Sequence, residues 1–244
     1  MRQPRIKQMI QLVQIASIAW LAGIAAFIGG VFARIEGSAE SEGKRKFIHG
    51  VVAFGGGILV AAVAFALVPH GMKTLSPVVL AVTFCAGGAI CCLFNIRIEK
   101  SGGRMAQFMA MLLDFIPEAM ALGAVFGQSR SAGMLLALFI GAQNLPEGFN
   151  AFRETVAGGV KQRAALSALF LVSFLGPAAA CFGHLFLHSY PTVTACIMSA
   201  AAGGILYLVF EDIAPQAAMK RHWGPSLGAV LGFAVGMIGK QILG

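Results

Sequence analysis

The sequence has few charged residues for its length. Lysine, arginine, aspartate and glutamate make up 11% of its 244 residues, whereas soluble domains average about 25%. It also lacks a CxxC pair, a GxxxxGK[ST] nucleotide-binding loop, and the GxSxG and HExxH motifs of hydrolases. The net charge of +8 comes without a long basic run or an aromatic-basic patch. These absences argue against a soluble domain, an ATP-driven pump, a hydrolase and a nucleic-acid partner.

Hydrophobic residues make up 58% of the sequence. Apolar runs of about 20 residues are typical of transmembrane helices. The sequence contains eight such runs, which predict an all-α integral membrane protein with a single transmembrane domain over residues 1–244. The predicted spans are roughly 9–33, 47–69, 76–97, 105–127, 131–152, 164–187, 192–215 and 224–243. The first run is longer than the apolar region of a signal peptide, so we expect an uncleaved span.

Positive charges are unevenly divided among the connections between the predicted spans. Connections after odd-numbered spans hold 12 lysines and arginines, and those after even-numbered spans hold two. Because cytoplasmic connections carry the excess of lysine and arginine, the odd-numbered connections are predicted to be cytoplasmic. An even number of spans then places both termini outside. The N-terminal tail, with Arg2, Arg5 and Lys7, opposes this orientation, and we give more weight to the connections.

Two predicted spans carry polar side chains inside their apolar runs. MLLDFIPEAMAL places Asp114 and Glu118 one helical turn apart on the fourth span. LFIGAQNLPEGFNAF does the same with Gln143 and Glu147 on the fifth span, where Asn144 adds a second amide. These side chains mark the two spans as the candidate functional part of the molecule, because ionisable groups at membrane depth are costly.

Each of these polar turns brackets a proline. Pro117 cannot donate a hydrogen bond to the carbonyl of Leu113, and Pro146 cannot donate one to the carbonyl of Ala142. We therefore expect each helix to kink and to leave a carbonyl oxygen free. Such an oxygen is tolerated at membrane depth only where it faces protein or a wet cavity.

The three carboxylates have no counter-ion within their spans, since neither span contains lysine or arginine. Protonation or a bound cation would remove their mutual repulsion, and a divalent metal ion would satisfy several oxygens together. Carboxylate and amide oxygens favour hard to borderline divalent ions. The alternative interpretation is that the acids are protonated and only hold the helices together.

Other polar residues lie near the ends of predicted spans and have two interpretations each. Glu211 and Asp212, near the inner end of the seventh span, form either an exit relay for metal or an acidic helix end. His184 and His188, towards the outer end of the sixth span, either capture metal or form an interfacial pair. His70 is either an entrance group or a helix terminus.

These motifs resemble the ZIP (Zrt/Irt-like) family of divalent metal transporters. The HNxPEG-like and [HQ][ND]xPEG-like motifs of that family read here as DFIPEA over 114–119 and QNLPEG over 143–148. FGGGILVAAVAFALVPHG (54–71), FLGPAAA (174–180) and AAAGGILYLVFEDIAP (200–215) are similar to its second, sixth and seventh spans. The resemblance therefore covers most of the chain in the expected order.

The resemblance implies a 3+2+3 bundle, in which spans 1–3 and 6–8 are related by a pseudo-twofold axis and enclose spans 4 and 5. It further implies a metal site at mid-membrane between spans 4 and 5, and transport towards the cytoplasm. The expected mechanism is an elevator-like motion of spans 1, 4, 5 and 6 against the rest. A homodimer in the lipid bilayer is also implied.

The sequence departs from the family pattern in ways that affect the site. Asp114 and Phe115 stand where the family usually has histidine and asparagine, and Gly176 stands where many relatives have an acid before the proline of span 6. We therefore predict one metal site instead of two. Its expected ligands are Asp114, Glu118, Gln143 and Glu147, with Asn144 hydrogen-bonding at its edge.

The predicted function is the transport of divalent transition-metal ions across the cell membrane, plasma or inner, by a multi-pass protein that is not an enzyme. No prosthetic group is expected, and the metal is the substrate. Zn²⁺ comes first because the affinity order favours it over Mn²⁺ and Fe²⁺. Fe²⁺ and Mn²⁺ are further candidates because the ligand set holds no imidazole or thiolate, and Cd²⁺ is a third. The alternatives are a proton-relay transporter of another solute and a metal sensor that does not transport.

Overall fold

The computed structural model describes residues 2–37, 41–100, 106–219 and 222–243, and within these ranges the chain forms only helices and their connections. The all-α prediction is therefore confirmed for the described residues. The helical elements, of which η denotes a π-helical turn, are α1 (Arg2–Glu36), α2 (Glu42–Ala62), η1 (Val63–Leu67), α3 (Val68–Thr74), α4 (Pro77–Lys100), α5 (Ala106–Phe126), α6 (Arg130–Ala157), α7 (Gln162–Val172), α8 (Leu175–Phe182), η2 (Gly183–Leu187), α9 (Pro191–Leu208), η3 (Val209–Ile213), α10 (Ala214–Ala217) and α11 (Gly224–Leu243).

Short local signals set the ends of the helices that surround the central part of the bundle. Gly37 and Gly159 follow α1 and α6 with φ angles of 72° and 93°, a region that glycine adopts without steric cost. Ser41 and Ser129 precede α2 and α6, and their hydroxyl oxygens accept hydrogen bonds from the first-turn amides of Lys44 and Ala132. The helices therefore begin and end where their flanking residues satisfy the free backbone groups.

Two of the π-helical turns share a cause in the sequence. Both η1 and η3 end two residues before a proline, Pro69 or Pro215. A proline inside a helix clashes with the preceding turn and removes one of its hydrogen bonds. A π-turn, whose hydrogen bonds join residues i and i+5, gives the preceding turn more room. Each of these two helical segments also contains a GGIL sequence some turns before its proline, beginning at Gly56 in α2 and at Gly203 in α9. The two long helical segments thus repeat one local design.

Among the described residues, seven helices or continuous helical segments are long and apolar enough to cross a membrane: Gln8–Glu36, Glu42–Thr74, Pro77–Arg97, Phe108–Phe126, Gln162–Leu187, Pro191–Ala217 and Gly224–Leu243. They coincide with seven of the eight predicted spans. The other predicted span, 131–152, falls within α6, which is 28 residues long. The middle of this helix contains Gln143, Asn144 and Glu147, and these polar residues lower the mean hydropathy of its apolar run. The structure is thus that of a multi-pass membrane protein.

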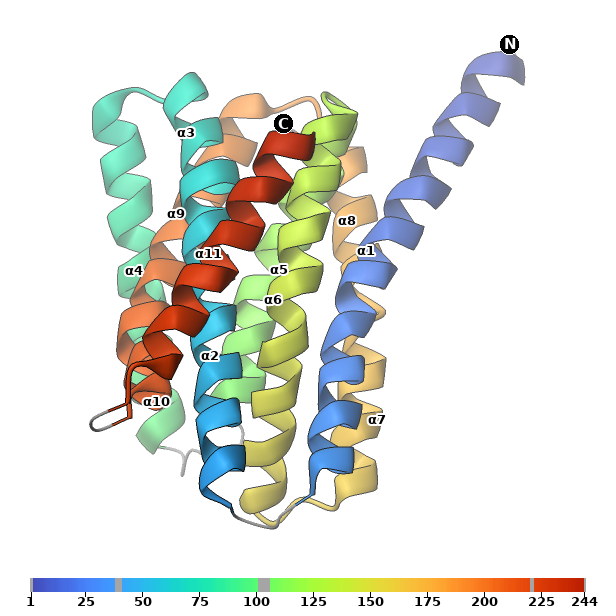
Figure 1. The fold of residues 1–244 in the computed structure, drawn as a ribbon. Coiled ribbons are helices and arrows are strands. Elements are labelled where there is room, and N and C mark those ends of the chain that lie inside the picture. The colour runs from blue at the N-terminus through green and yellow to red at the C-terminus, as the bar shows by residue number, and fades with distance from the viewer. Residues whose placement is uncertain (1, 38–40, 101–105, 220–221, 244) are drawn as a thin grey trace.

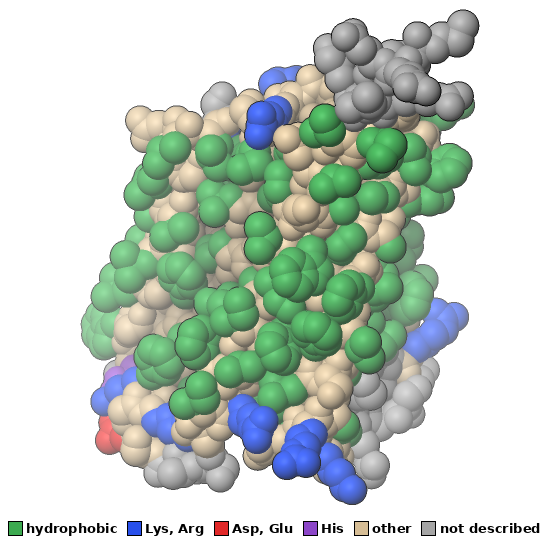
Figure 2. Space-filling model, turned by 90° about the vertical axis from the view of Figure 1, so that its right-hand side faces the viewer, with side chains coloured by type: hydrophobic (Ala, Val, Ile, Leu, Met, Phe, Trp, Pro, Cys, Tyr) green, Lys and Arg blue, Asp and Glu red, His purple; other side chains and the backbone are tan. Residues whose placement is uncertain are grey.

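Both ends of the described chain lie at the same end of the bundle, the upper end in Figure 1, and the connections that follow α1 and α6 lie at the lower end. Figure 2 shows hydrophobic side chains over the middle of one face, with lysine and arginine gathered mainly along its lower edge. Arg104, Lys220 and Arg221, which contribute to the predicted charge asymmetry, lie outside the described residues. The charges that the structure describes are thus concentrated at one end.

Reciprocal pairs of glycines bring four pairs of helices into backbone contact. A Cβ atom at each of these glycines would fall 1.8–2.0 Å from a carbonyl oxygen of the partner helix, so no larger residue fits without a shift of the backbone. The pairs are Gly29 and Gly148 between α1 and α6, Gly57 and Gly232 between α2 and α11, Gly87 and Gly203 between α4 and α9, and Gly123 and Gly183 between α5 and α8–η2. Small residues at such interfaces are typical of helix packing in lipid.

The contacts divide the helices into two groups. The first helix group contains α1, α5, α6, α7, α8 and η2, and the second contains α2, η1, α3, α4, α9, η3, α10 and α11. All four glycine pairs lie within one group or the other. The groups meet mainly where α2 and α11 touch α6 and where α4 and α9 touch α5. The closest backbone contacts therefore hold each group together, whereas α5 and α6 lie at the boundary between the groups.

The glycine contacts make a testable prediction about stability. Gly87→Ala would place a methyl group 1.8 Å from the Ala200 carbonyl oxygen, and we expect a loss of about 1–3 kcal/mol, the usual cost of overpacking. The measurement is the thermal unfolding midpoint of the purified protein in detergent.

Gly50→Ala is the matched control, because a Cβ atom at Gly50 would meet no described atom of another segment within 4 Å. It should leave stability unchanged or raise it by up to about 1 kcal/mol through its better helix propensity. Equal midpoints for Gly87→Ala and the unaltered protein would contradict this account of the α4–α9 contact.

Candidate metal centre

The two polar turns predicted from the sequence lie on neighbouring helices, α5 and α6, in the middle of the bundle (Figure 1). Glu118 on α5 and Gln143 on α6 are both fully buried. The Nε2 atom of Gln143 donates a hydrogen bond of 2.6 Å to Oε2 of Glu118. A short bond to a carboxylate is the strong, charge-assisted kind, so this contact joins the two helices at the site.

The other two predicted ligands lie beside this contact. Asp114, one turn before Glu118, is 7% exposed, and its carboxylate interacts electrostatically with Glu118 and with the thiol of Cys91 on α4. The carboxylate of Glu147 interacts electrostatically with those of Asp114 and Glu118. The structure therefore brings all three acids into one region between α5, α6 and α4.

Three oxygens of this region have no hydrogen-bond partner among the described residues. They are Glu118 Oε1, Gln143 Oε1 and Glu147 Oε2, and each is buried. A buried polar atom without a partner costs about 1–3 kcal/mol, and oxygens of this type are ligands for divalent cations. In the described part of the chain, however, no three His, Cys, Asp or Glu side chains stand close enough together to hold a metal ion. A cation bound here would have to draw these oxygens together.

The second polar motif presents two different faces. Gln143 and Glu147 are one turn apart and face the acids of α5. Asn144 and Gly148, also one turn apart, face α1: Asn144 Nδ2 donates a 3.0 Å hydrogen bond to the carbonyl oxygen of Ala22. A Cβ atom at Gly148 would lie 2.0 Å from the carbonyl oxygen of Ala26, one turn further along α1. The motif therefore both supplies candidate ligands and attaches α1 to α6.

Both prolines lie inside uninterrupted helices, Pro117 in α5 and Pro146 in α6. Pro146 is buried against α2, where a Cβ atom at Gly55 would lie 2.7 Å from its ring. Pro146, the residue before the candidate ligand Glu147, thus packs across the boundary between the two helix groups.

Phe115 and Gly176 form one packed contact that sequence reasoning treated as two separate departures from a family pattern. A Cβ atom at Gly176 on α8 would lie 2.6 Å from Cζ of Phe115, and one at Gly23 on α1 would lie 2.7 Å from the same atom. Phe115 is 2% exposed. The phenyl ring therefore fills the space that these two glycines leave between α1 and α8.

The weaker candidates lie elsewhere. Glu211 and Asp212 are in η3 towards the lower end of the bundle, where Asp212 accepts a 2.8 Å hydrogen bond from Gln216. His184 and His188 lie together in and just after η2, near the upper end. The structure thus gathers the four main candidates and places these two pairs towards opposite ends.

Two cavities approach the polar region from opposite ends of the bundle. One, of about 440 Å³, runs along α1, α2 and α6 and is lined by Glu36 and Pro146 among others. The other, of about 200 Å³, is lined by His70, Lys73 and Lys240. Neither is lined by Asp114, Glu118, Gln143 or Glu147. The four candidate ligands are therefore closed off from both cavities in this conformation.

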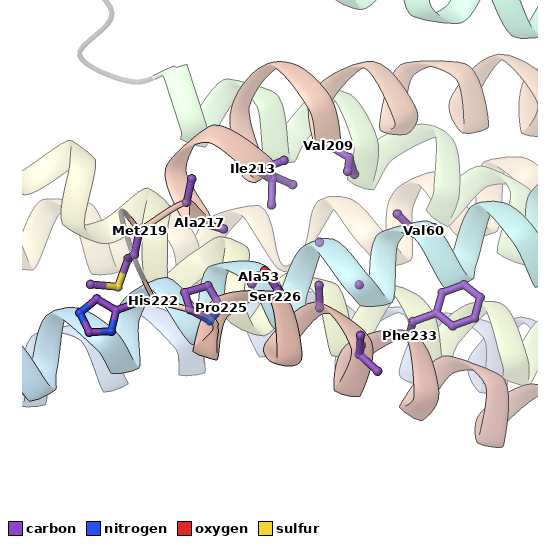
Figure 3. A pocket seen from close by; sticks show the side chains of 16 residues that line it. Ala53, Val60, Val209, Ile213, Ala217, Met219, His222, Pro225, Ser226 and Phe233 are labelled. Carbon is purple, nitrogen blue, oxygen red and sulfur yellow. The ribbon is translucent and has the colours of Figure 1, made fainter.

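A larger cavity of about 570 Å³ lies within the second helix group, between α2, η3, α10 and α11. Figure 3 shows His222 and Met219 together at one end of its lining, and Val60 and Phe233 at the other. Its walls are mostly hydrocarbon and none of the four main candidate ligands lines it. This cavity is therefore separate from the candidate metal centre.

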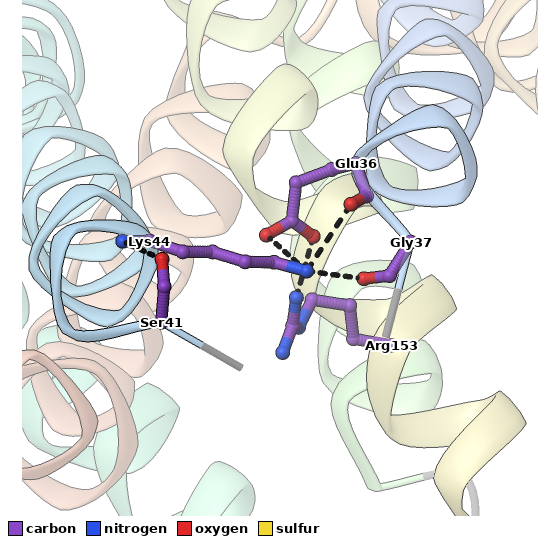
Figure 4. A network of polar contacts seen from close by, with 5 residues as sticks. All are labelled: Glu36, Gly37, Ser41, Lys44 and Arg153. Atoms are coloured by element: carbon purple, nitrogen blue, oxygen red, sulfur yellow. Dashed lines mark hydrogen bonds and ion pairs between the residues drawn. The ribbon is translucent and has the colours of Figure 1, made fainter. Parts of the chain in front are cut away.

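A network of ion pairs ties the lower ends of α1, α2 and α6 together (Figure 4). Glu36 receives Lys44 Nζ at 3.1 Å on one carboxylate oxygen and Arg153 NH1 at 2.6 Å on the other. Lys44 Nζ also donates to the carbonyl oxygen of Gly37 at 2.6 Å. The orientation prediction includes Lys44 and Arg153 only as positive charges. Glu36, an acid beside a basic connection, is the feature of the sequence that indicates this network.

No protein-family model matches the chain, and no curated protein matches it.

The division of the second motif into two faces can be tested with Asn144→Ala. Loss of the hydrogen bond to Ala22 should lower stability by about 1 kcal/mol, the usual size of an interhelical hydrogen bond in membranes. The measurement is the thermal unfolding midpoint in detergent, taken together with the affinity for Zn²⁺.

Because Asn144 faces α1, the affinity for Zn²⁺ should change much less than in Gln143→Ala, the matched control on the other face. An Asn144→Ala protein that keeps its stability but binds Zn²⁺ as weakly as Gln143→Ala would contradict the division.

Proposed function

We propose that this chain is a member of the ZIP family that carries divalent transition-metal ions across a cell membrane towards the cytoplasm. The observation that carries the proposal is the set of buried oxygens of Glu118, Gln143 and Glu147 that lack partners in the described structure, next to Asp114 and between two central helices. Hydrocarbon cannot stabilise such a group, whereas one divalent cation satisfies several of these oxygens at once.

In this proposal α6 also crosses the membrane, as the fifth of eight spans. Its 28 residues correspond to a length of about 42 Å, which exceeds the thickness of about 30 Å of the hydrocarbon layer. Its polar turn faces α5 and α1 instead of lipid. The lower, basic end of the bundle is cytoplasmic by the positive-inside rule, and both termini are then outside.

Oxygen ligands from carboxylates and an amide are harder than sites with imidazole or thiolate. Zn²⁺ remains first among the substrates because of its position in the affinity order, followed by Fe²⁺, Mn²⁺ and Cd²⁺. Phe115 supports one metal site instead of two, because its ring fills the space between Gly23 and Gly176. We propose no catalytic role and no resident cofactor.

The two helix groups support an elevator-like mechanism. Backbone contacts at the glycine pairs hold each group together, and the candidate ligands lie on α5 and α6 of the first group. Movement of the first group along the second would expose the acids to each side in turn, which is the general behaviour of transporters with a midplane site. The ion pair between Lys44 of α2 and Glu36 of α1 lies between the groups at the lower end and would favour the conformation described here.

Uptake into proteoliposomes tests the proposal. Zn²⁺, Fe²⁺, Mn²⁺ and Cd²⁺ are offered separately to vesicles that contain either the unaltered protein or Glu118→Gln combined with Glu147→Gln. We expect uptake that falls to the level of protein-free vesicles in the double variant, because two negative charges at the site are lost while side-chain volume is kept. Glu42→Gln, at an exposed residue of the lower end, is the control and should transport normally.

The two alternatives give different results. A metal sensor would bind the ions without moving any of them. A proton-relay transporter of another solute would show no dependence on metal in either binding or uptake. Absence of uptake for all four ions, in vesicles where the protein is folded, would contradict the proposed function.

A further inference from the structure

Two imidazoles lie side by side at the upper end of the bundle, apart from the acids of α5 and α6. His184 belongs to η2 and His188 follows it, and their ring centroids are 5.5 Å apart with an angle of 33° between the planes. His184 is 8% exposed. Both rings lie against Gly127, where a Cβ atom would fall 2.7 Å from Nδ1 of His188 and 3.1 Å from Cε1 of His184.

The sequence brings these rings onto the backbone of α5. Gly123 and Gly183 form one of the reciprocal glycine contacts, and a Cβ atom at Gly183 would lie 1.9 Å from the carbonyl oxygen of Met120. The amide of His188 bonds to the carbonyl oxygen of Gly183 at 3.1 Å, the i to i+5 pattern of a π-turn. Isolated π-turns within helices occur frequently at functional sites.

The backbone of α5 lies against both rings. The ring of His184 interacts with the backbone of Gly123, and its Nδ1 is buried without a partner in the described structure. His188 Nδ1 lies 3.4 Å from the carbonyl oxygen of Ala124. A carbonyl oxygen only accepts hydrogen bonds, so Nδ1 of His188 carries the proton and the lone pair of that ring is on Nε2.

For His188 this arrangement is that of a metal-binding histidine, which usually donates its second ring N–H to a carbonyl or carboxylate group. Two imidazoles on one tetrahedral Zn²⁺ at about 2.0–2.1 Å per Zn–N bond have ring centroids roughly 5 Å apart. The centroid distance of 5.5 Å needs only a small adjustment to match it.

We propose that His184 and His188 form a second, separate metal site that binds borderline divalent ions such as Zn²⁺ at the end of the bundle where both termini lie. Neutral imidazole favours these ions over Mg²⁺ and Ca²⁺. In the described structure no third His, Cys, Asp or Glu joins the pair, so water completes the coordination and the ion exchanges readily.

In transport, the site would bind an incoming metal ion before the ion reaches the acids of α5 and α6. This role rests on the proposed function. Ala124 is six residues beyond Glu118 on α5, or about 9 Å along the helix. A readily exchanged ion at this distance would be available to the acids. Binding itself does not depend on transport.

The experiment uses the full chain in lipid nanodiscs with Glu118→Gln and Glu147→Gln, so that the acids do not compete for metal. Zn²⁺ binding is measured by calorimetry, and the ligands are identified by X-ray absorption at the zinc edge. Into this background we introduce His184→Gln and His188→Asn, of which the second keeps an amide donor for the carbonyl oxygen of Ala124. Each variant removes the imidazole ring and keeps a polar side chain, and thermal unfolding checks that it remains folded.

We expect the background protein to bind Zn²⁺, and its X-ray absorption spectrum at the zinc edge to show scattering from imidazole ligands. Either histidine variant should weaken binding by at least about tenfold, since even the loss of an outer partner costs about 10–100-fold. His222→Gln, in the connection before α11, should leave binding unchanged.

Equal Zn²⁺ affinity in all folded variants, or zinc without imidazole ligands, would overturn the proposal and make the histidines a packing pair. Failure of the transport function would appear differently, as missing uptake in a protein that still binds Zn²⁺ through these histidines.

Discussion

Carboxylates between two helices at membrane depth must be stabilised by groups of the protein or by an ion, since hydrocarbon stabilises neither their charge nor their lone pairs. In this chain Glu118 receives one short hydrogen bond from Gln143, while three neighbouring oxygens receive none from the described residues. The packing around the site meets this constraint: α1 and α2 pack against α6, α8 and α9 pack against α5, and Asp114 and Glu118 are buried. The function that we propose follows from what would satisfy these oxygens.

The same constraint explains why one short motif contributes to two contacts. Gln143 and Glu147 face α5, and Asn144 and Gly148 attach α1 to α6 one residue away. Any motion of α6 therefore carries α1 with it. The other glycine contacts act in the same way within each helix group, so that a change of conformation is easiest at the boundary, where contacts are made by side chains.

The apolar runs predicted the helices well because span length and hydropathy are local properties of the sequence. The acids could also be found, since charged groups are rare within such runs. The contact between Phe115 and Gly176, and the bond from Asn144 to Ala22, could not be predicted, because they depend on how segments far apart in the sequence pack. Periodicity showed that Asn144 and Gly148 share a helical face, but only the packing shows that this face meets α1.

The most direct test of the account is to locate the ion. Crystals of the full chain grown with Zn²⁺ and measured at the zinc absorption edge would give an anomalous difference peak for each bound ion. The account predicts a peak between α5 and α6, within about 2.0–2.2 Å of oxygens of Asp114, Glu118, Gln143 or Glu147. A protein that transports Zn²⁺ but shows no peak between these helices, with zinc only elsewhere along the bundle, would contradict it.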